Sequence, residues 1–316
     1  MPEIKAYAPG IYARSEELVQ ATRDLDRDRA TAEAVEERRV ADMRSFLEVQ
    51  REARLDYLSD GLLNWQDIFR PFCEAARGLE PGPLTRFLDT NTFFRAPAAT
   101  EEAPKLLEPV GEPYFHIEAL PRNRWVATLP SPASLALASS ATAAGELTPR
   151  AVAEGVLGPQ IRWLAQNGCA MVVLQETALL GDRIDVYHLG EALDALQSPL
   201  PISLQLPFGD SGDIQGELLE LDGVEAIGVD FYAVELEALP RPFPKTLLAG
   251  VVNARNSLLE EPEQLATFGR QLLEELDGGL HLVPNGDLQF VPERIAREKV
   301  LRLGEVARVL KEEQSR

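Results

Sequence analysis

The sequence predicts an α/β fold: a (β/α)8 TIM barrel with an N-terminal helical segment and a long inserted loop. Apolar, strand-like runs alternate with helix-like segments over most of the chain, which is typical of parallel sheets with right-handed crossovers. About eight strands are expected, the number that closes into a barrel. The chain has 316 residues, and one such barrel typically takes about 250. We therefore expect residues 1–316 to form a single domain; a doubly wound open sheet is the alternative.

The N-terminal third begins with a short strand near Tyr7, followed by a helical segment. The stretch of about residues 15–54 is rich in Ala, Glu and Arg, so we expect helices there, with one break near Asp28. A second strand near Leu55 follows. Residues 78–110 contain many prolines and no clean periodicity, which predicts a long loop. Inside a compact domain such loops are usually functional or disordered.

Strands and helices alternate after this loop. Residues 171–174 form a continuous apolar run, as is typical of a buried parallel strand. The other strands are expected at residues 114–120, 125–129, 202–206, 226–229, 247–252 and 280–283, and the helices at 148–166, 185–196, 213–220, 262–276 and 292–311. No GxGxxG or GxxxxGK[ST] motif follows any of these strands, which argues against a nucleotide-binding open sheet.

Charge and composition exclude several classes of protein. The chain carries 51 acidic and 31 basic residues, a net charge of −20, so its surface should repel nucleic acid and anionic membranes. Cys73 and Cys169 form no CxxC motif, which argues against disulfides or a cysteine metal site. No apolar run approaches the length of a membrane span, and the N-terminus lacks a signal-peptide core. We expect a cytoplasmic protein.

Polar residues follow most of the predicted strands, where TIM barrels carry their chemistry. Any one of them could be an ordinary turn residue, but a ring of them favours a site for a small-molecule ligand. The candidates are Asp60, Trp65, Gln175, Glu176, Asp230, Asn253, Arg255, Asn285 and Asp287.

Glu176 is the most informative member of this ring because four apolar residues precede it. A carboxylate there should be partly desolvated and must either pair or hold a raised pKa. We therefore take Glu176, with Asp60, as a candidate catalytic acid or base. Arg14, Arg86 and Arg255 are candidate counter-charges. A Glu–Arg pair that only braces the barrel mouth is the alternative.

The segment of residues 84–94, LTRFLDTNTFF, mixes a cation, a carboxylate and an amide with aromatic residues. A protein core does not need this mixture, because each polar group buried without a partner costs about 1–3 kcal/mol. Arg86, Asp89, Asn91 and Arg95 are therefore candidate ligand-binding residues. The two arginines could together receive one carboxylate.

The three histidines, His116, His188 and His281, are scattered along the chain. None lies in a spacing typical of metal ligands. His281 is flanked by leucines in a predicted strand, where a hydrogen-bonded core histidine is the better interpretation. No metal site is expected.

Several blocks, in order, resemble the cobalamin-independent methionine synthases, and they span nearly the whole chain. DTN at 89–91, after a basic residue, and GVVNARN at 250–256 are the specific ones. The weaker blocks are GIYARSEEL at 10–18, LDYLSDG at 55–61, LPSPASL at 129–135, LQETAL at 174–179 and NGDLQFVP at 285–292. The chain is most similar to the N-terminal, zinc-free barrel of that family, within a barrel superfamily shared with uroporphyrinogen decarboxylases. The resemblance implies methyl transfer from methyltetrahydrofolate to homocysteine.

The departures from the family are as informative as the matches. The catalytic barrel of the family binds zinc through His, Cys, Glu and a second Cys. The matching positions here are Leu204, Leu206, Asp230 and Gly286. Two leucines and a glycine cannot ligate zinc. The carboxylates that hold the amino group of homocysteine match Leu62 and Gln175, so binding of that substrate is also in doubt.

Three functions remain open. The chain could be an accessory barrel without a bound cofactor, which binds methyltetrahydrofolate as methyl donor and works with a separate zinc-bearing catalytic barrel. It could instead be a stand-alone, zinc-free enzyme that uses Glu176 and Asp60. It could also be a non-catalytic regulatory barrel that binds a small carboxylate. Loss of the zinc ligands favours the first and third functions, and the polar ring favours the first and second. Whether the chain is an enzyme stays open.

An accessory barrel should expose an apolar patch, because stable association buries roughly 1,200–2,000 Å². The segment of residues 65–69 together with Phe72 is a candidate for that patch. Ordinary packing within the barrel is the alternative, and the better one.

Overall fold

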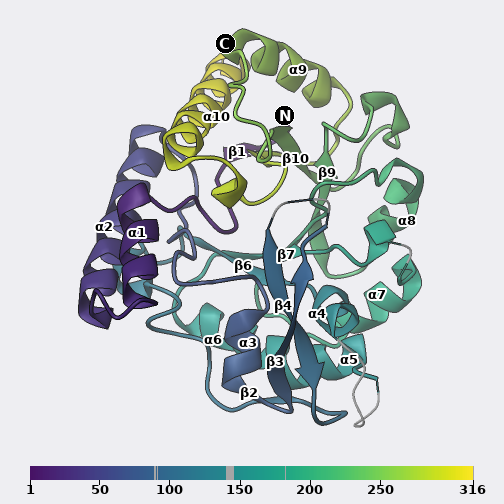
Figure 1. Ribbon diagram of the computed structural model, residues 1–316. Helices are drawn as coiled ribbons and strands as arrows, with labels where there is room; N and C mark the ends of the chain where they lie inside the picture. Colours follow the sequence, from purple (N-terminus) through teal and green to yellow (C-terminus); the bar gives the residue numbers. More distant parts are fainter. Residues whose placement is uncertain (89, 91, 140–145, 182, 316) are drawn as a thin grey trace.

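The computed structural model describes residues 1–88, 90, 92–139, 146–181 and 183–315. Its main sheet is parallel and seven-stranded, in the order β1-β11-β10-β9-β8-β7-β6, with helices outside it (Figure 1). The strands are β1 (Ile4–Ala6), β6 (Val126–Pro130), β7 (Met171–Gln175), β8 (Ile202–Gln205), β9 (Val224–Asp230), β10 (Thr246–Val252) and β11 (Leu280–Pro284). The predicted α/β class and parallel sheet are confirmed, but the described strands form a curled sheet and not the closed eight-stranded barrel that was expected.

The segment of residues 55–58 contacts both edge strands of this sheet. Leu58 forms an isolated parallel bridge with Trp125, next to β6. On the other side, the Asp56 N–H donates to the Ala6 carbonyl (2.9 Å), and the Ala6 N–H donates to the Asp56 side chain (2.7 Å). The Asp56 carboxylate thus takes the place of a backbone carbonyl as the acceptor for Ala6. The strand expected near Leu55 is therefore reduced to one bridge. The described sheet has seven strands, not the eight predicted.

The N-terminal helical segment folds as predicted. It consists of α1 (Glu16–Leu25) and α2 (Ala32–Glu52), and the break falls at Asp28, whose φ is +55°. α2 packs against α10 (Glu293–Gln314). The approach is so close that a Cβ on Gly304 would overlap the Ala53 carbonyl, so glycine is required at that position.

The helices that follow the strands cover the outside of the sheet (Figure 1). They are α4 (Pro132–Ala138), α5 (Pro149–Val152), α6 (Gly158–Gln166), α7 (Val186–Asp194), α8 (Gln215–Leu219) and α9 (Pro262–Glu274), with the π-helical turn η2 (Ala153–Leu157) joining α5 to α6. All of them except α4 overlap a predicted helix; α4 was not predicted. No helix of the described residues is long and apolar enough to cross a membrane.

The region predicted as a long loop contains a β-hairpin instead. After α3 (Arg70–Ala75), β3 (Leu79–Arg86) pairs antiparallel with β4 (Phe93–Ala99), and β2 (Ala76–Arg77) pairs with β5 (Lys105–Leu106). Figure 1 shows the hairpin in front of the sheet. The prolines of this region led to the prediction of a loop. Proline cannot donate a ladder hydrogen bond and is therefore found in edge strands, and both strands of a two-stranded ribbon are edge strands. Two residues of the DTN block, Asp89 and Asn91, lie outside the described residues.

The strand predicted at residues 114–120 is also wrong. Tyr114 and Phe115 donate to the Gly111 carbonyl, and the short 3-10 helix η1 (Ile117–Ala119) follows. Phe115 is buried, so its apolar character reflects core packing and not a strand.

The inside of the curled sheet is packed with side chains. Tyr7, Val126, Met171, Val173, Ala226, Leu248 and Val283 form one buried cluster. Tyr7 hydrogen-bonds His281 Nδ1 (3.1 Å), and burial lowers the pKa of His281 to about 4. His281 is therefore a neutral, hydrogen-bonded core residue at neutral pH, as predicted. Polar side chains that could meet a ligand lie at the carboxyl ends of the strands.

Candidate functional site at the carboxyl ends of the strands

Glu176 lies directly after β7 and is completely buried. Its carboxylate accepts hydrogen bonds from the hydroxyls of Ser131 and Ser134 and from the backbone N–H groups of Ala178 and Leu179. Burial raises the pKa of Glu176, and these hydrogen bonds oppose that shift. The donors are neutral groups rather than the arginines suggested by the sequence. Glu176 therefore braces the loop after β7 against the start of α4.

Asp60 follows the 55–58 segment and is also buried. It accepts hydrogen bonds from the backbone N–H groups of His116 (3.0 Å) and Leu62 (3.2 Å). Burial raises the pKa of Asp60, and these N–H groups and the His116 ring oppose the shift. Asp60 thus serves mainly to hold residue 116 in place.

His116 was not predicted as a site residue, because its contacts with Glu112 and Asp60 are not visible in the sequence. Its Nδ1 lies 3.2 Å from Glu112 Oε2, and its buried Nε2 has no partner among the described residues. Asp60 and His116 are 56 positions apart, which excludes a local motif, so only the fold brings the two together. The group is an acid–base cluster at the edge of the sheet.

Asp287 connects three segments of the rim: its own, the end of β7 and the opening loop. It accepts hydrogen bonds from Gln175 Nε2 (2.6 Å), Gln289 Nε2 (2.9 Å) and the Ile11 N–H (3.1 Å). A Cβ on Gly10, whose φ is +87°, would overlap Asp287 Oδ1, so only glycine allows the opening loop this close. Burial raises the pKa of Asp287 to about 6 despite these hydrogen bonds.

Asp230, at the end of β9, is the least satisfied carboxylate of the rim. Its Oδ1 accepts from Asn285 Nδ2 (2.9 Å) and the Tyr232 N–H (2.9 Å), whereas its buried Oδ2 has no hydrogen-bond partner among the described residues. Burial raises the pKa of Asp230; the Asn285 and Tyr232 hydrogen bonds, the Arg255 charge and a nearby Phe208 N–H lower it. That N–H falls short of hydrogen-bonding geometry, so Oδ2 remains open to a donor.

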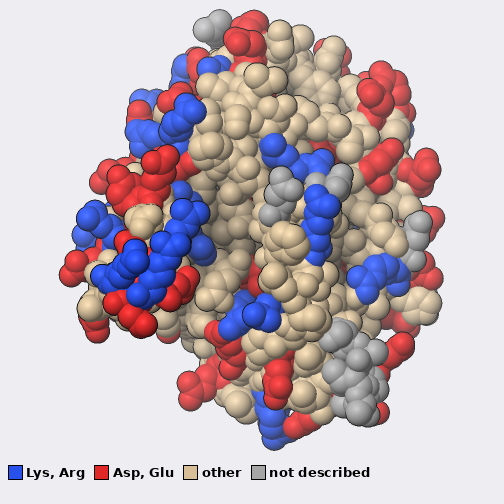
Figure 2. Space-filling view, viewed as in Figure 1, with Lys and Arg blue, Asp and Glu red and all other residues tan. Residues whose placement is uncertain are grey.

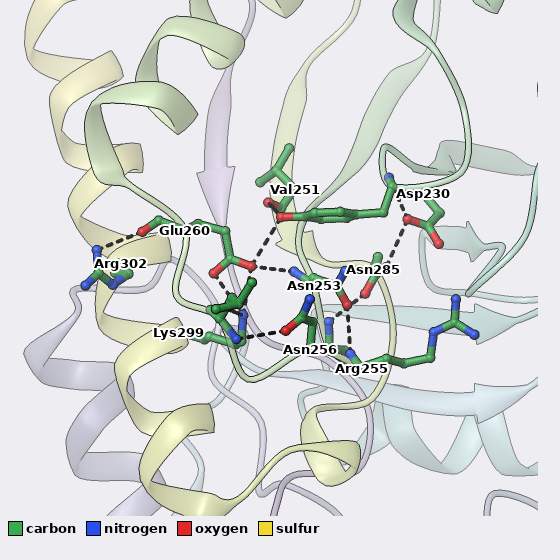
Figure 3. Close-up of polar contacts among 12 residues, drawn as sticks. Asp230, Val251, Asn253, Arg255, Asn256, Glu260, Asn285, Lys299 and Arg302 are labelled. Atoms are coloured by element: carbon green, nitrogen blue, oxygen red, sulfur yellow. Dashed lines mark hydrogen bonds and ion pairs between the residues drawn. The ribbon is translucent and has the colours of Figure 1, made fainter. Parts of the chain in front are cut away.

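Arg255 is presented by a loop that a buried ion pair anchors (Figure 3). Lys299 is fully buried and donates to Glu260 (2.8 and 3.0 Å) and to the Leu258 carbonyl (2.7 Å). Glu260 in turn accepts from the Asn253 N–H (2.8 Å), and the Asn253 side chain accepts from the Arg255 N–H (2.9 Å). Lys299 therefore holds the position of Arg255 through the 253–260 loop.

Aromatic rings close the mouth of the sheet beneath the hairpin. The Arg255 guanidinium lies 4.6 Å from the Phe208 ring centre, Phe208 packs edge-on against Phe290, and Phe290 stacks on Phe87 of the hairpin turn. The cavity left between the hairpin and the rim measures about 20 Å³, roughly enough for one water molecule. A cavity of that size, bounded by described residues, is far smaller than the roughly 300–1,000 Å³ of small-molecule sites.

The remaining sequence candidates lie outside this mouth. Arg14 donates to the carbonyls of Leu63 (3.0 Å) and Trp65 (2.7 Å), and burial lowers its pKa. Trp65 is a buried core residue whose indole donates to the Tyr114 carbonyl (3.0 Å). Both residues stabilise the turn after Asp60.

Arg86 and Arg95 lie on the hairpin. Arg86 donates to the Thr90 carbonyl (2.5 Å) and Arg95 to the Gly82 carbonyl (3.1 Å). The structure thus separates the hairpin candidates from the strand-end candidates. Within the strand-end group it brings Gln175 to Asp287 and Asp230 close to Arg255.

The residues at the family's zinc positions do not fit zinc. Leu204 and Leu206 are buried at the end of β8, and a Cβ on Gly286 would overlap the Phe208 ring. Of the four residues, only Asp230 has a side-chain atom that can bind zinc, whereas zinc sites in proteins use three or four nitrogen, sulfur or oxygen ligands. Among the described residues no group of three or more His, Cys, Asp or Glu side chains is arranged to hold a metal ion.

The fold and the rim together define a class: a curled parallel α/β sheet with buried, internally hydrogen-bonded polar residues at its carboxyl ends. Neither a protein-family model nor a curated protein sequence matches the chain.

Solved structures do match over nearly its full length. A B12-independent methionine synthase from Shewanella sp. W3-18-1, in complex with selenomethionine, aligns with a TM-score of 0.73 at 14% identity and covers 98% of both chains. A protein from Listeria monocytogenes assigned as a vitamin-B12-independent methionine synthase gives 0.70 at 16%, over 96% of both chains. A methyltransferase from Methanosarcina mazei gives 0.53 at 13%, over 99% of this chain and 95% of the other. The chain therefore has the fold of the cobalamin-independent methionine synthases, and the resemblance in its sequence is confirmed at that level.

The buried Lys299–Glu260 pair gives a direct test of the anchored loop. Lys299→Met leaves the Glu260 carboxylate buried without its counter-charge, so we expect a loss of about 3–5 kcal/mol in the free energy of unfolding. The double variant Lys299→Met/Glu260→Gln should lose clearly less than the sum of the single variants, because neither charge is then stranded. Urea denaturation measures all three. Additive losses, or a cost below about 1 kcal/mol for Lys299→Met, would show that the pair does not hold the loop.

The raised pKa of Asp287 predicts a pH dependence of stability. A carboxyl whose pKa is about 6 in the folded chain and about 3.9 when unfolded binds its proton more tightly in the folded state. Its contribution is fully present below about pH 4 and is lost as the pH rises through 6. Relative to Asp287→Asn, the wild type should lose about 2–3 kcal/mol between pH 4 and pH 7.5. Urea titrations at both pH values measure this, and a difference that does not change with pH contradicts it.

Proposed function

We propose that this chain is a zinc-free, methionine synthase-like barrel that acts as an accessory component in methyl transfer to homocysteine. A separate catalytic barrel would supply the zinc, and this chain would help bind the methyl donor. The rim carries the proposal: leucines and a glycine backed by Phe208 stand where the family has zinc ligands. A thiol such as that of homocysteine, with a pKa near 8.5 when free, needs such an activating group to become a strong nucleophile at neutral pH.

The outer face of the β3–β4 hairpin supports a role in docking. Leu84, Leu88 and Phe93 are 63%, 38% and 51% exposed. Arg86 pairs with Phe93 and Arg95 with Leu84 across the hairpin, so both guanidinium groups share the face of the apolar residues. Figure 2 shows Lys and Arg side chains in the middle of this view, over the hairpin. On a chain of net charge −20, this cationic, apolar face suits a partner surface with acidic groups.

The apolar patch suggested by the sequence lies elsewhere and does not serve this purpose. Trp65, Ile68, Phe69 and Phe72 are all buried, in contacts such as Trp65 against Phe72 and Phe69 against Phe94. The packing alternative is therefore correct for that segment, and the hairpin takes its place in the proposal.

The same face offers a place for the methyl donor. Methyltetrahydrofolate carries carboxylates on its glutamate tail, and guanidinium groups bind carboxylates well. Because the space beneath the hairpin is only about 20 Å³, the donor would bind between the outer face of the hairpin and the partner, not inside the mouth. Arg86 and Arg95 are the residues assigned to that contact.

A non-catalytic regulatory barrel is the second candidate, and the closed rim favours it. Glu176 accepts four hydrogen bonds and Asp287 three, so both carboxylates are engaged mainly with the chain itself. Asp60 is buried and accepts two backbone hydrogen bonds, and stand-alone catalysis by Glu176 and Asp60 is therefore disfavoured.

We also infer that residues 1–316 form one domain and that the 55–58 segment completes the cylinder as its eighth member. One continuous hydrophobic core supports this: it contains Met43 of the N-terminal helices, Phe94 of the hairpin and Val300 of the last helix.

Calorimetric titration tests the proposal. Methyltetrahydrofolate with a triglutamate tail should bind the chain in the presence of a cobalamin-independent methionine synthase that retains its zinc ligands. Arg86→Ala and Arg95→Ala should each weaken that binding about tenfold, since each removes a charge-assisted hydrogen bond. Arg44→Ala, on the exposed side of α2, is the matched control and should bind like the wild type.

No heat of binding with any folate, alone or with the zinc-bearing partner, removes the accessory role and leaves the regulatory one. Equal affinity in Arg86→Ala, Arg95→Ala and the wild type would move the donor away from the hairpin.

A further inference from the structure

A groove of about 860 Å³ lies beside the closed mouth. Its lining includes Leu137, Leu179, Arg183 and Ile214. These residues belong to the segments that follow β6, β7 and β8. The groove therefore opens on the carboxyl-end face, where barrels of this type bind ligands. Its volume lies within the range of small-molecule sites, roughly 300–1,000 Å³.

The floor of the groove is apolar. Leu137, Leu179, Ile184 and Ile214 line it, and three of the four are only half-buried although they pack against the core. When a ligand covers such aliphatic side chains, the free energy of binding becomes more favourable by about 25 cal/mol for each Å² of apolar surface buried. The floor thus suits a hydrocarbon or aromatic body.

The rim of the groove contains one cation without a partner. Arg150 pairs with Glu154 (2.8 Å), and His188 pairs with Asp185 (2.7 Å), which also caps α7. The Arg183 guanidinium, in contrast, forms no hydrogen bond or ion pair with any residue that the structure describes. An unpaired guanidinium beside an apolar floor is suited to receive a carboxylate in a bidentate fork.

The acidic residues of the lining limit the charge that the ligand can carry. Glu191 and Glu217 also face the groove, so a ligand with several negative charges would be repelled. The lining fits a single negative charge on an uncharged body.

We propose that this groove binds a small monocarboxylate with an apolar body. Arg183 holds the carboxylate, and the body lies on Leu137, Leu179, Ile184 and Ile214. The site is separate from the hairpin and the mouth. If the groove binds no carboxylate, the proposed accessory role is unaffected, and if the accessory role is wrong, the groove proposal is unaffected.

Titration of the full chain with 4-phenylbutyrate tests the site. We expect saturable binding of one equivalent. Arg183→Ala should weaken it about tenfold, and Arg183→Lys should weaken it less, because a lysine keeps the charge but loses the fork. The uncharged analogue 4-phenylbutan-1-ol should bind weakly and equally to the wild type and Arg183→Ala. Arg44→Ala, far along the chain on α2, should bind like the wild type.

A second variant tests the floor. Ile184→Gln places a polar group among the aliphatic side chains without touching Arg183, and should weaken 4-phenylbutyrate at least threefold while leaving the thermal midpoint nearly unchanged. The proposal is overturned if the wild type shows no saturable binding, or if Arg183→Ala binds as tightly as the wild type.

Discussion

The burial of four carboxylates at the carboxyl ends of the strands is the constraint on which the rim depends. Asp60, Glu176, Asp230 and Asp287 are all buried. A buried charge is tolerated only where hydrogen bonds or opposite charges compensate it. The chain supplies these from serine, asparagine and glutamine side chains and from backbone N–H groups. The hydrogen bonds of these carboxylates thus mainly hold loops together. Of the four, only Asp230 has an oxygen without a partner among the described residues.

The rim is apolar at the positions that the sequence resemblance matches to zinc ligands. Leu204 and Leu206 extend the apolar core to the end of β8, and Phe208 fills the space that Gly286 leaves. Phe208 then supports Arg255 on one side and contacts Phe290 on the other. Apolar side chains pack at these positions. The outer face of the hairpin and the groove beside Arg183 are the surfaces proposed for recognition.

Much of the fold could be predicted from the sequence, because periodicity and strand-helix alternation are local signals. The apolar run at 171–174 and the break near Asp28 fell where predicted. The hairpin could not be predicted, because its prolines mask strands that pair only with each other. In the site, the residues at strand ends were predictable but their roles were not. Two of the four hydrogen bonds of Glu176 come from Ser131 and Ser134, more than 40 positions away, and only the fold brings these residues together.

The central claim is that this rim does not ligate zinc, and metal analysis tests it most directly. The protein would be produced with added zinc, passed through a mild chelator and analysed by inductively coupled plasma mass spectrometry. The account predicts far less than one zinc per chain, with the fold unchanged by the chelator. One tightly held zinc per chain, lost together with folded structure on stronger chelation, would contradict it.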